Sequence, residues 1–469
     1  MSDEPACSAS FMKDWPTNAR RAGILLHPTS LPGGTLADVT RWLDFLQASG
    51  CMVWQMLPLG VPLGVPLGGL SPYQCASAFA VNPALFPNGR ADMRRFTRWR
   101  RAQQHWLGDY ARFIVIKQLH HGASWVDWPD ALRQRQPDTL LAFDRLHEAD
   151  LLAVMTEQYR VYAHWQGIRR DAAERGIALF GDMPIFVAHD SADVWAHPEQ
   201  FLLDEAGLPT VVTGVPPDYF SETGQRWGNP HYNWTVMHAQ GFDWWLDRLR
   251  YHFEWFDLVR IDHFRGLAAA WTIPAAEATA VNGYWQAVPG ADLLQKIKLE
   301  MGHIPLVAED LGIITADVTA LRNAYDLPGM AVLQFAFDAH ADNPHKPDNV
   351  GPETVYYTGT HDNDTTLGWF TQLPEPVQQQ VQQQLNAQNA QQVLDAMCST
   401  VLNSRAMLAI LPMQDILRLG SEARMNTPGT TTGNWTWQFE WNRLSPDLAP
   451  RLLTQLQKAH RCETQPLPV

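Results

Sequence analysis

The chain has 469 residues, of which 46% are hydrophobic and 18% are charged, and it carries a formal net charge of −14 at pH 7. A chain of this length and composition can bury a sizeable core, which excludes the disordered class. The negative charge argues against nucleic acid and against an anionic membrane as partners.

The amino-terminal 21 residues contain no apolar stretch typical of a signal peptide, and we find no uninterrupted apolar run of membrane-spanning length in the chain. The cysteines are scattered and form neither a CxxC pair nor a disulfide framework, which indicates a reducing compartment. They are Cys7, Cys51, Cys75, Cys398 and Cys462. These features predict a cytoplasmic protein.

Eight β-rich runs follow one another along the chain, and helical patterns lie between many of them. The runs span residues 23–28, 52–60, 177–187, 256–265, 305–312, 330–337, 354–362 and 407–415. One helical pattern, DVTRWLDFLQASG, has Gly50 where the helix should end. Eight strands alternating with helices predict an α/β fold, a parallel sheet closed into a (β/α)8 TIM barrel. An open doubly wound sheet is not favoured, because no glycine-rich phosphate loop follows the first run.

The spacing of these runs is uneven, with long gaps after the second and the third. We expect one catalytic domain over residues 1–469, with inserted subdomains in the βα loops at 61–175 and at 188–255. The segment GVPLGVPLGG at 60–69 is too rich in Gly and Pro for a helix or a central strand and is expected to be a loop. The Gln-rich segment 377–392 predicts a polar surface helix.

The fourth run contains the stretch LVRIDHFRG, which places an arginine and an aspartate on one face of a buried strand. Side chains alternate along a strand, so Val259 and Ile261 face one way and Leu258, Arg260 and Asp262 the other. In a barrel the apolar pair packs outward on helices, and the charged pair points inward near the carboxyl end, where barrel enzymes keep their chemistry. A structural Arg–Asp pair that closes the barrel mouth is the alternative.

Two further runs also end in carboxylates. The fifth ends in Glu309 and Asp310, which must face opposite sides, so that one reaches the barrel mouth while the other pairs with neighbours or caps a helix. The seventh ends in His361, Asp362 and Asp364. A carboxylate at a strand end is often only the N-cap of the next helix. Three such ends in one barrel nevertheless favour a site where carboxylates converge.

Convergent carboxylates suit the cleavage of a glycosidic bond with retention. This reaction needs a nucleophile and a general acid with carboxyl groups ~5–5.5 Å apart. Its transition state is cationic, so nearby anions stabilise it, and crowded negative charge raises the pKa of one carboxyl group. Arg260, on the same strand face as Asp262, would keep that carboxylate ionised and therefore nucleophilic.

The sequence motifs give less support to a metal site or to a serine hydrolase site. The HDND stretch at 361–364 lacks the glycine turn and the distal Glu of a calcium loop. His120 and His121 cannot place both imidazoles on one face of a helix or a strand. No GxSxG nucleophile elbow occurs. We therefore expect no metal and no organic cofactor.

The chain contains 20 tryptophans, a high number. Core packing is the default role of an aromatic side chain. A surplus of indole rings also suits a protein that stacks them against the flat faces of sugars. Composition alone leaves both roles open.

These residues resemble those of the 4-α-glucanotransferases, also called amylomaltases or disproportionating enzymes, of the α-amylase superfamily. The resemblance runs over nearly the whole chain, in the order typical of the family. Its segments are GILLHPTSLPG (23–33), WQMLPLG (54–60), SPYQCASAFAVNP (71–83), GDMPIFVAHDSADVWAHPEQF (181–201), GQRWGNPHYNW (224–234), VRIDHFRG (259–266), VAEDLG (307–312), VLQFAF (332–337), GTHDNDT (359–365) and RMNTPGTTTGNWTW (424–437).

The resemblance implies a (β/α)8 barrel with inserted subdomains and no separate carboxyl-terminal β domain. It implies Asp262 as nucleophile, Glu309 as general acid/base and Asp362 as the third carboxylate, which distorts and stabilises the donor sugar. The implied substrate-binding residues are Arg260, His361, Tyr73, Ser71, Asp182, Trp227, Phe335 and Asn434. Trp227 would cover acceptor sugars, so the 188–255 insertion is expected to be an acceptor-side lid.

The implied partners are a maltodextrin or other 1,4-α-glucan donor and a glucose or glucan acceptor, with the oligomeric state left open. Two loops depart from the family pattern. SLPGGTLADV is shorter, and GVPLGVPLGGLSPYQ replaces a shorter and more polar loop. Both border the donor side of the cleft. Two alternatives stay open at this point: an α-glucan hydrolase with the same triad, and a non-catalytic maltodextrin-binding protein.

Overall fold

A parallel sheet of eight strands forms the centre of the molecule. The computed structural model describes residues 20–64, 71–89, 91–217 and 221–462. The strands are β1 (Arg21–Leu25), β2 (Val53–Gln55), β3 (Ala178–Met183), β6 (Leu258–Ile261), β9 (Leu306–Ala308), β10 (Gly329–Val332), β11 (Thr354–Tyr357) and β12 (Leu408–Pro412). Each falls within or overlaps one of the eight predicted runs, so the predicted strands are confirmed with shorter bounds.

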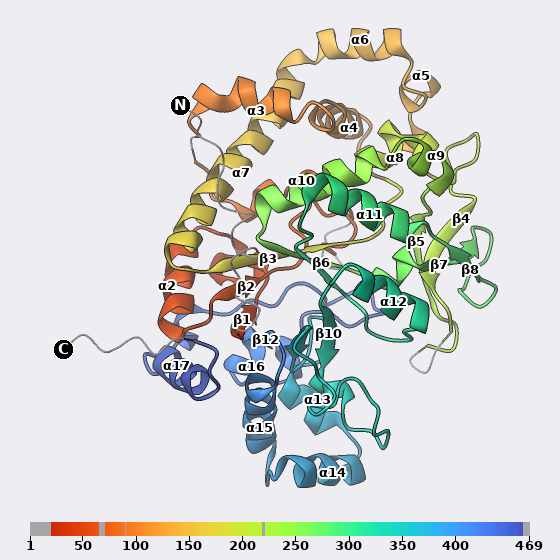
Figure 1. Cartoon of the computed structure of the whole chain (residues 1–469). Helices are drawn as coiled ribbons and strands as arrows, with labels where there is room; N and C mark the ends of the chain where they lie inside the picture. Colours follow the sequence, from red (N-terminus) through yellow and green to blue (C-terminus); the bar gives the residue numbers. More distant parts are fainter. Residues whose placement is uncertain (1–19, 65–70, 90, 218–220, 463–469) are drawn as a thin grey trace.

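The order of the strands shows that the sheet curls into a barrel. Hydrogen bonding runs β10-β11-β12-β1-β2-β3-β6-β9, which is chain order around a circle that starts at β10. The ladder is interrupted between β9 and β10, where the backbone N–H of Ala308 donates to the carbonyl of Pro328 at 2.8 Å. The (β/α)8 barrel predicted from the sequence is therefore confirmed as a nearly closed cylinder (Figure 1).

Helices surround the barrel. The segment of the chain that connects β2 to β3 also forms a separate layer of helices. The helices are α2 (Val39–Ser49), α3 (Phe96–Ala102), α4 (Leu107–Leu119), α5 (Asp130–Arg133), α6 (Pro137–Leu146), α7 (Glu148–Glu174), α8 (Ala192–Ala196), α9 (Trp234–Ala239), α10 (Asp243–Trp255), α11 (Gly290–Met301), α12 (Ala316–Ala324), α13 (Thr366–Gln372), α14 (Glu375–Leu385), α15 (Ala390–Asn403), α16 (Met413–Ile416) and α17 (Leu448–Lys458). In Figure 1 the α3 to α6 layer lies at one end of the molecule and α14 at the other.

Two helix predictions can be compared with the structure. The helix α2 ends at Gly50, whose φ of 75° is left-handed, as the sequence pattern predicts. The Gln-rich segment forms α14 and the start of α15 where one helix was expected. Asn386, at φ 50°, ends the first helix, and the side chain of Asn389 caps the second. Residues 65–69 of the loop predicted at 60–69 lie outside the described residues, and residues 60–64 form only isolated bridges to Val81 and Cys75.

A second, antiparallel sheet was not predicted. Its strands pair in the order β5-β4-β7-β8 and span Val211–Val215 (β4), Gln225–Pro230 (β5), Ala269–Pro274 (β7) and Tyr284–Ala287 (β8). The first two lie in the 188–255 range and the other two follow β6, so the sheet draws on two βα segments. The boundaries of the inserted subdomains stay a prediction.

The interior of the barrel is apolar at one end and charged at the other. Leu258, Phe180 and Val355 belong to one buried cluster inside the barrel, whereas Val259 and Ile261 pack in the larger cluster that includes the surrounding helices. The predicted alternation of the 258–262 strand is therefore confirmed. In the part of the chain that the structure describes, no helix has both the length and the hydrophobicity to cross a membrane.

A glycine on β3 permits close packing of the barrel against the following segment. A Cβ atom on Gly181 would lie 2.3 Å from the Phe256 ring. We expect Gly181→Ala to lower the free energy of unfolding by about 1–3 kcal/mol, because the buried ring must shift. The matched control is Gly167→Ala in α7, where the nearest atom, at 3.9 Å, ends a flexible arginine. That variant should gain ~0.5–1 kcal/mol from helix propensity. Denaturant titration of both variants checks this, and equal stability of the two would contradict the packing argument.

Candidate active site

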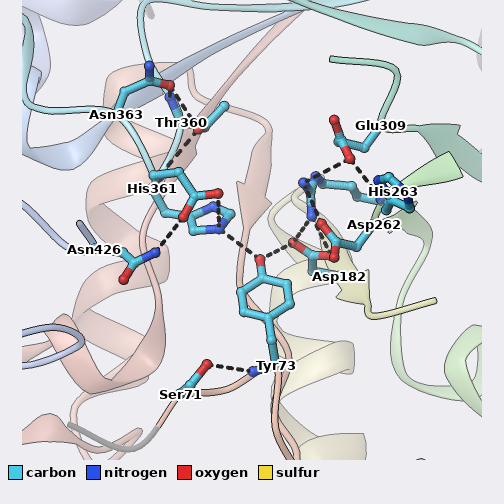
Figure 2. Close-up of polar contacts among 12 residues, drawn as sticks. Ser71, Tyr73, Asp182, Asp262, His263, Glu309, Thr360, His361, Asn363 and Asn426 are labelled. Atoms are coloured by element: carbon cyan, nitrogen blue, oxygen red, sulfur yellow. Dashed lines mark hydrogen bonds and ion pairs between the residues drawn. The ribbon is translucent and has the colours of Figure 1, made fainter. Parts of the chain in front are cut away.

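Four strands of the barrel deliver polar side chains to one end of the cylinder (Figure 2). Asp182 lies near the end of β3 and Arg260 near the end of β6, and Asp262 follows β6 directly. Glu309 follows β9, and His361 and Asp362 lie in the loop after β11. Because all strands of a parallel barrel end on the same rim, residues far apart in the chain meet here.

Arg260 links three of the carboxylates. Its Nη1 donates to both oxygens of Asp182, at 2.9 and 2.8 Å, and its Nη2 lies 2.9 Å from Oδ1 of Asp262. The same Nη2 is 3.9 Å from Oε2 of Glu309. The arginine is only 4% exposed. Burial by itself would lower its pKa, but the facing carboxylates raise the pKa of Arg260 well above its usual range, so the side chain stays cationic.

The shared nitrogen limits the separation of the two predicted catalytic carboxylates. Nη2 lies 2.9 Å from Oδ1 of Asp262 and 3.9 Å from Oε2 of Glu309, so the distance between these two oxygens cannot exceed the sum of the two values. This limit accommodates the ~5–5.5 Å separation of retaining glycosidases and lies at the lower edge of the ~6.5–9.5 Å range of inverting ones. The geometry therefore fits a retaining reaction.

Glu309 has the environment of an acid. The backbone N–H groups of His263 and Leu311 donate to its two oxygens at 2.7 and 2.9 Å. Burial, assisted by the negative charge of Asp262, raises the pKa of Glu309 to about 7, although Arg260 and the two N–H groups oppose the shift. A large share of this carboxyl group is therefore protonated near neutral pH.

The neighbour of Glu309 turns away from the site, as the strand alternation predicts. Asp310 accepts a hydrogen bond from the backbone N–H of Met330 at 2.7 Å and forms an ion pair with Arg322. It thus ties the loop after β9 to β10, and only Glu309 reaches the barrel mouth.

Asp262 combines a fixed charge partner with access to solvent. One oxygen is paired with Arg260, while 29% of the side-chain surface remains exposed. An ionised carboxylate that is held by a cation and still accessible is suited to attack an electrophilic carbon.

The HDND stretch separates into one accessible carboxylate and one structural carboxylate. Asp362 keeps 46% of its side chain exposed, and its Oδ1 accepts a hydrogen bond from Nδ2 of Asn426 at 2.6 Å. His361 Nε2 lies 3.4 Å from its other oxygen. Asp364 is buried and accepts hydrogen bonds from Ser421 and Gln372. Asp362 alone of the two aspartates is available to a ligand.

Tyr73 connects the two sides of the site. Its hydroxyl donates to Oδ2 of Asp182 at 2.8 Å and lies 3.0 Å from Nε2 of His361. The Tyr73 and His361 rings stack with centroids 5.3 Å apart. Ser71, also predicted to bind substrate, accepts a hydrogen bond from the Tyr73 backbone N–H at 3.3 Å, so its visible role is to shape the turn.

The remaining predicted residues lie in different surroundings. Trp227 packs edge-on against His263, with ring centroids 4.9 Å apart, and therefore lies beside the site. Phe335 is 37% exposed and contacts His345, and the described contacts do not connect it with the carboxylates. Asn434 is buried and bonds Thr427 and Thr430, so it braces its own loop.

Sequence reasoning missed several residues that touch the predicted site, and two of them come from one segment. These two are Asn426, which fixes Asp362, and Trp435, whose ring lies 6.0 Å from those of both Tyr73 and His361. Both belong to the segment RMNTPGTTTGNWTW, which was noticed as a whole, but only Asn434 was selected from it. No strand pattern in that segment indicates which side chains turn inward.

The geometry of the described residues includes no metal centre. No group of three or more His, Cys, Asp or Glu side chains among them is arranged to hold a metal ion. The site consists instead of four carboxyl groups, one arginine, one histidine and one tyrosine that lie around one opening.

Comparison with known proteins gives consistent matches. The family model described as 4-alpha-glucanotransferase, glycoside hydrolase family 77, matches residues 26–88 and 87–444. The chain is 44% identical to a 4-alpha-glucanotransferase of Thermus thermophilus, covering 94% of this chain and 99% of the relative. It is 42% identical to the enzyme of the same name from Synechocystis, covering 92% and 96%. A solved structure of amylomaltase from Streptococcus agalactiae in complex with acarbose matches with a TM-score of 0.90 and 30% identity, covering 95% of this chain and all of that one.

The pairing of Asp182 with Arg260 generates a stability prediction. Asp182→Ala leaves Nη1 of a buried arginine without its acceptors. We expect a loss of about 3 kcal/mol, the lower end of the range for breaking a buried ion pair, because Asp262 still faces the guanidinium. Asp130→Ala, which breaks the exposed pair with Arg133, is the control and should change stability by less than about 0.5 kcal/mol. Equal unfolding midpoints for the two variants would refute the structural role of Asp182.

Proposed function

The chain belongs to the 4-α-glucanotransferase family, glycoside hydrolase family 77, and we propose that it transfers segments of 1,4-α-glucan to the 4-hydroxyl group of a glucose or glucan acceptor. The observation that supports this most directly is the arrangement of Asp262 and Glu309 on one nitrogen of Arg260. The donor is a maltodextrin or a longer 1,4-α-glucan.

In the first step Asp262 attacks the anomeric carbon of the donor sugar. The glycosidic oxygen departs with the proton of Glu309, so a carboxylate ester forms, the glycosidic bond breaks, and Glu309 becomes an anion. The raised pKa of Glu309 provides that proton near neutral pH. The product of this step is a β-glucosyl ester of Asp262.

In the second step an acceptor replaces the departed chain. Glu309, now ionised, removes the proton from the acceptor 4-hydroxyl as its oxygen attacks the anomeric carbon. The ester bond breaks, a new α-1,4 bond forms, and Glu309 regains its proton. Two inversions at the same carbon give overall retention. Neither step requires a metal or an organic cofactor.

The surrounding residues stabilise the charged states of these steps. Arg260 stabilises the negative charge of the Asp262 carboxylate before its attack and again when it leaves the sugar in the second step. Asp362, held by Asn426, provides a second anion for the cationic transition state and an acceptor for sugar hydroxyls. Tyr73 and His361 present stacked rings and polar atoms at the same opening, a surface suited to one sugar of the donor.

Transfer competes with hydrolysis by the same residues. The acceptor must reach the ester before water does, which aromatic cover over the site favours. Trp227 beside His263 provides such cover. Incubation with maltotriose separates the two activities, because transfer yields glucose and longer oligomers, whereas hydrolysis steadily increases the reducing ends. A non-catalytic maltodextrin-binding protein would leave maltotriose unchanged.

Two further proposals concern the chain as a whole. We propose that residues 61–175 and 188–255 are insertions in a single catalytic domain and that the second is an acceptor-side lid, since it carries Trp227. We also propose a cytoplasmic location, which the four free cysteines among the described residues support.

The assignment of the nucleophile can be tested directly. Asp262→Asn should lower maltotriose disproportionation by roughly 10⁴–10⁶-fold, because an amide cannot form the ester. Asp292→Asn, at an exposed carboxylate on α11, should keep full activity. Product ladders by chromatography, with circular dichroism to check folding, provide the measurement. A folded Asp262→Asn protein that works at the wild-type rate would eliminate this assignment.

A pH dependence follows from the acid role of Glu309. Only its protonated form can donate to the leaving oxygen, and that form is lost as the pH rises through about 7, the pKa of Glu309. We expect kcat/KM to fall about tenfold per pH unit above this value, since kcat/KM reports the free enzyme. Initial rates of glucose release from maltotriose, measured at low substrate concentration, would show this limb. A profile that stays flat up to pH 9 is incompatible with the assignment.

A further inference from the structure

The tryptophans of the chain divide by location, and one of them is conspicuously exposed. Most described tryptophans are buried in the core, including Trp42, Trp54, Trp165 and Trp245. Trp285, on the edge strand β8, is 39% exposed. The exposed part of this indole, on the edge of the sheet, is accessible to a ligand.

Two neighbouring side chains hold the Trp285 ring in place. Trp271 is its direct cross-strand neighbour on β7, and the two rings meet edge to face with centroids 5.2 Å apart. The guanidinium carbon of Arg265 lies over the Trp285 ring, 3.9 Å from its centroid. A cation–π contact and an aromatic pair on the same ring reduce the rotamer freedom that a ligand would otherwise have to remove.

Arg265 also links this ring to the backbone of a second exposed apolar residue. Its Nη1 donates to the carbonyl of Ile313 at 3.2 Å and to Oγ1 of Thr315 at 2.8 Å. Ile313 is 63% exposed. We call Arg265, Trp285 and Ile313 the β8 platform. It consists of a flat aromatic ring, an aliphatic side chain, and polar groups between them.

The β8 platform is continuous with the active site through the backbone. Arg265 follows the nucleophile Asp262 by three residues, so their Cα atoms lie within about 11 Å of each other. Ile313 follows Glu309 by four residues, and within this stretch the Leu311 N–H donates to the Glu309 carboxylate. Both segments that form the platform therefore start at the catalytic carboxylates.

The side of the site on which the β8 platform lies suggests its ligand. In the proposed reaction the acceptor 4-hydroxyl must approach Glu309, and the rest of an acceptor chain extends away from that residue. Sugars bind to proteins through flat apolar ring faces and through hydroxyl groups, and the platform offers an indole and polar groups for these. Ile313 belongs to the segment that leads outward from Glu309, which favours the acceptor chain over the donor chain.

We propose that the β8 platform is a remote acceptor subsite, in which Trp285 stacks on a glucose ring of a 1,4-α-glucan acceptor beyond the sugars held in the cleft. This inference rests on the proposed transferase function. A long acceptor reaches the platform and glucose does not, so Trp285 gives the enzyme a preference for long acceptors.

The test compares a short and a long acceptor with one activated donor, α-maltosyl fluoride, and follows fluoride release. We expect Trp285→Ala to raise the maltoheptaose concentration for half-maximal stimulation by about 5- to 30-fold relative to that for glucose, the effect of one stacking contact. Trp285→Phe, which keeps a ring, should show a smaller change. Tyr284→Ala is the matched control, because Tyr284 is 51% exposed on the same strand and points to the opposite face.

Several results would overturn the subsite. They are an unchanged ratio for Trp285→Ala, an equal shift for Tyr284→Ala, or a proportional loss with both acceptors, which indicates a purely structural ring. Sedimentation velocity adds another: a wild-type dimer that Trp285→Ala dissociates would assign the platform to a second copy of the chain. Failure of the wild-type protein to transfer to either acceptor would instead refute the proposed function, so the two failures are distinguishable.

Discussion

The structure of the site depends on one buried cation. Arg260 is almost completely removed from solvent and faces Asp182, Asp262 and Glu309. Removing a guanidinium from water is costly, and the cost is offset only when acceptors surround it with good geometry. Asp182, whose side chain is fully buried, satisfies one nitrogen with both of its oxygens. The other nitrogen is thereby directed to the two carboxylates that carry the proposed chemistry.

The same cation acts differently on these two carboxylates because their surroundings differ. Asp262 forms a close ion pair with Arg260 and remains partly exposed. Glu309 is farther from the arginine and buried, so loss of solvation and the charge of Asp262 raise its pKa. A buried carboxyl group with a raised pKa suits an acid, whereas an accessible carboxyl group paired with a cation suits a nucleophile. The distances to a single guanidinium nitrogen thus define both roles.

The barrel explains why such a buried charge is tolerated. Alternate residues of each strand point inward, and the inward residues form layers across the cylinder. The layers away from the carboxyl ends of the strands contain Leu258, Phe180 and Val355, which are buried and apolar. The layer at the carboxyl ends contains Asp182, Arg260 and Glu309. The apolar layers stabilise the fold, and the polar layer at the carboxyl ends of the strands is open to solvent and carries the proposed chemistry. The antiparallel sheet, whose strand β8 carries Trp285, lies to one side of the barrel (Figure 1).

The eight strands, the barrel and the inward direction of Arg260 and Asp262 could be predicted from the sequence, because strand periodicity is a local property and every parallel strand ends on one rim. The sequence also distinguished Glu309 from Asp310 as residues with opposite directions. The loop side chains that reach the rim could be identified only in the folded chain, because loops have no periodic pattern. Strand periodicity did not separate Asp362 from Asp364, and only the family resemblance favoured Asp362. The structure shows that Asp362 is accessible and Asp364 is buried. It also places Asn426 and Trp435 in the site and makes Asn434 a brace of its own loop. The antiparallel sheet was not predicted for a related reason. Its strands come from two βα segments, and a local sequence pattern does not show that strands so far apart in the chain pair with each other.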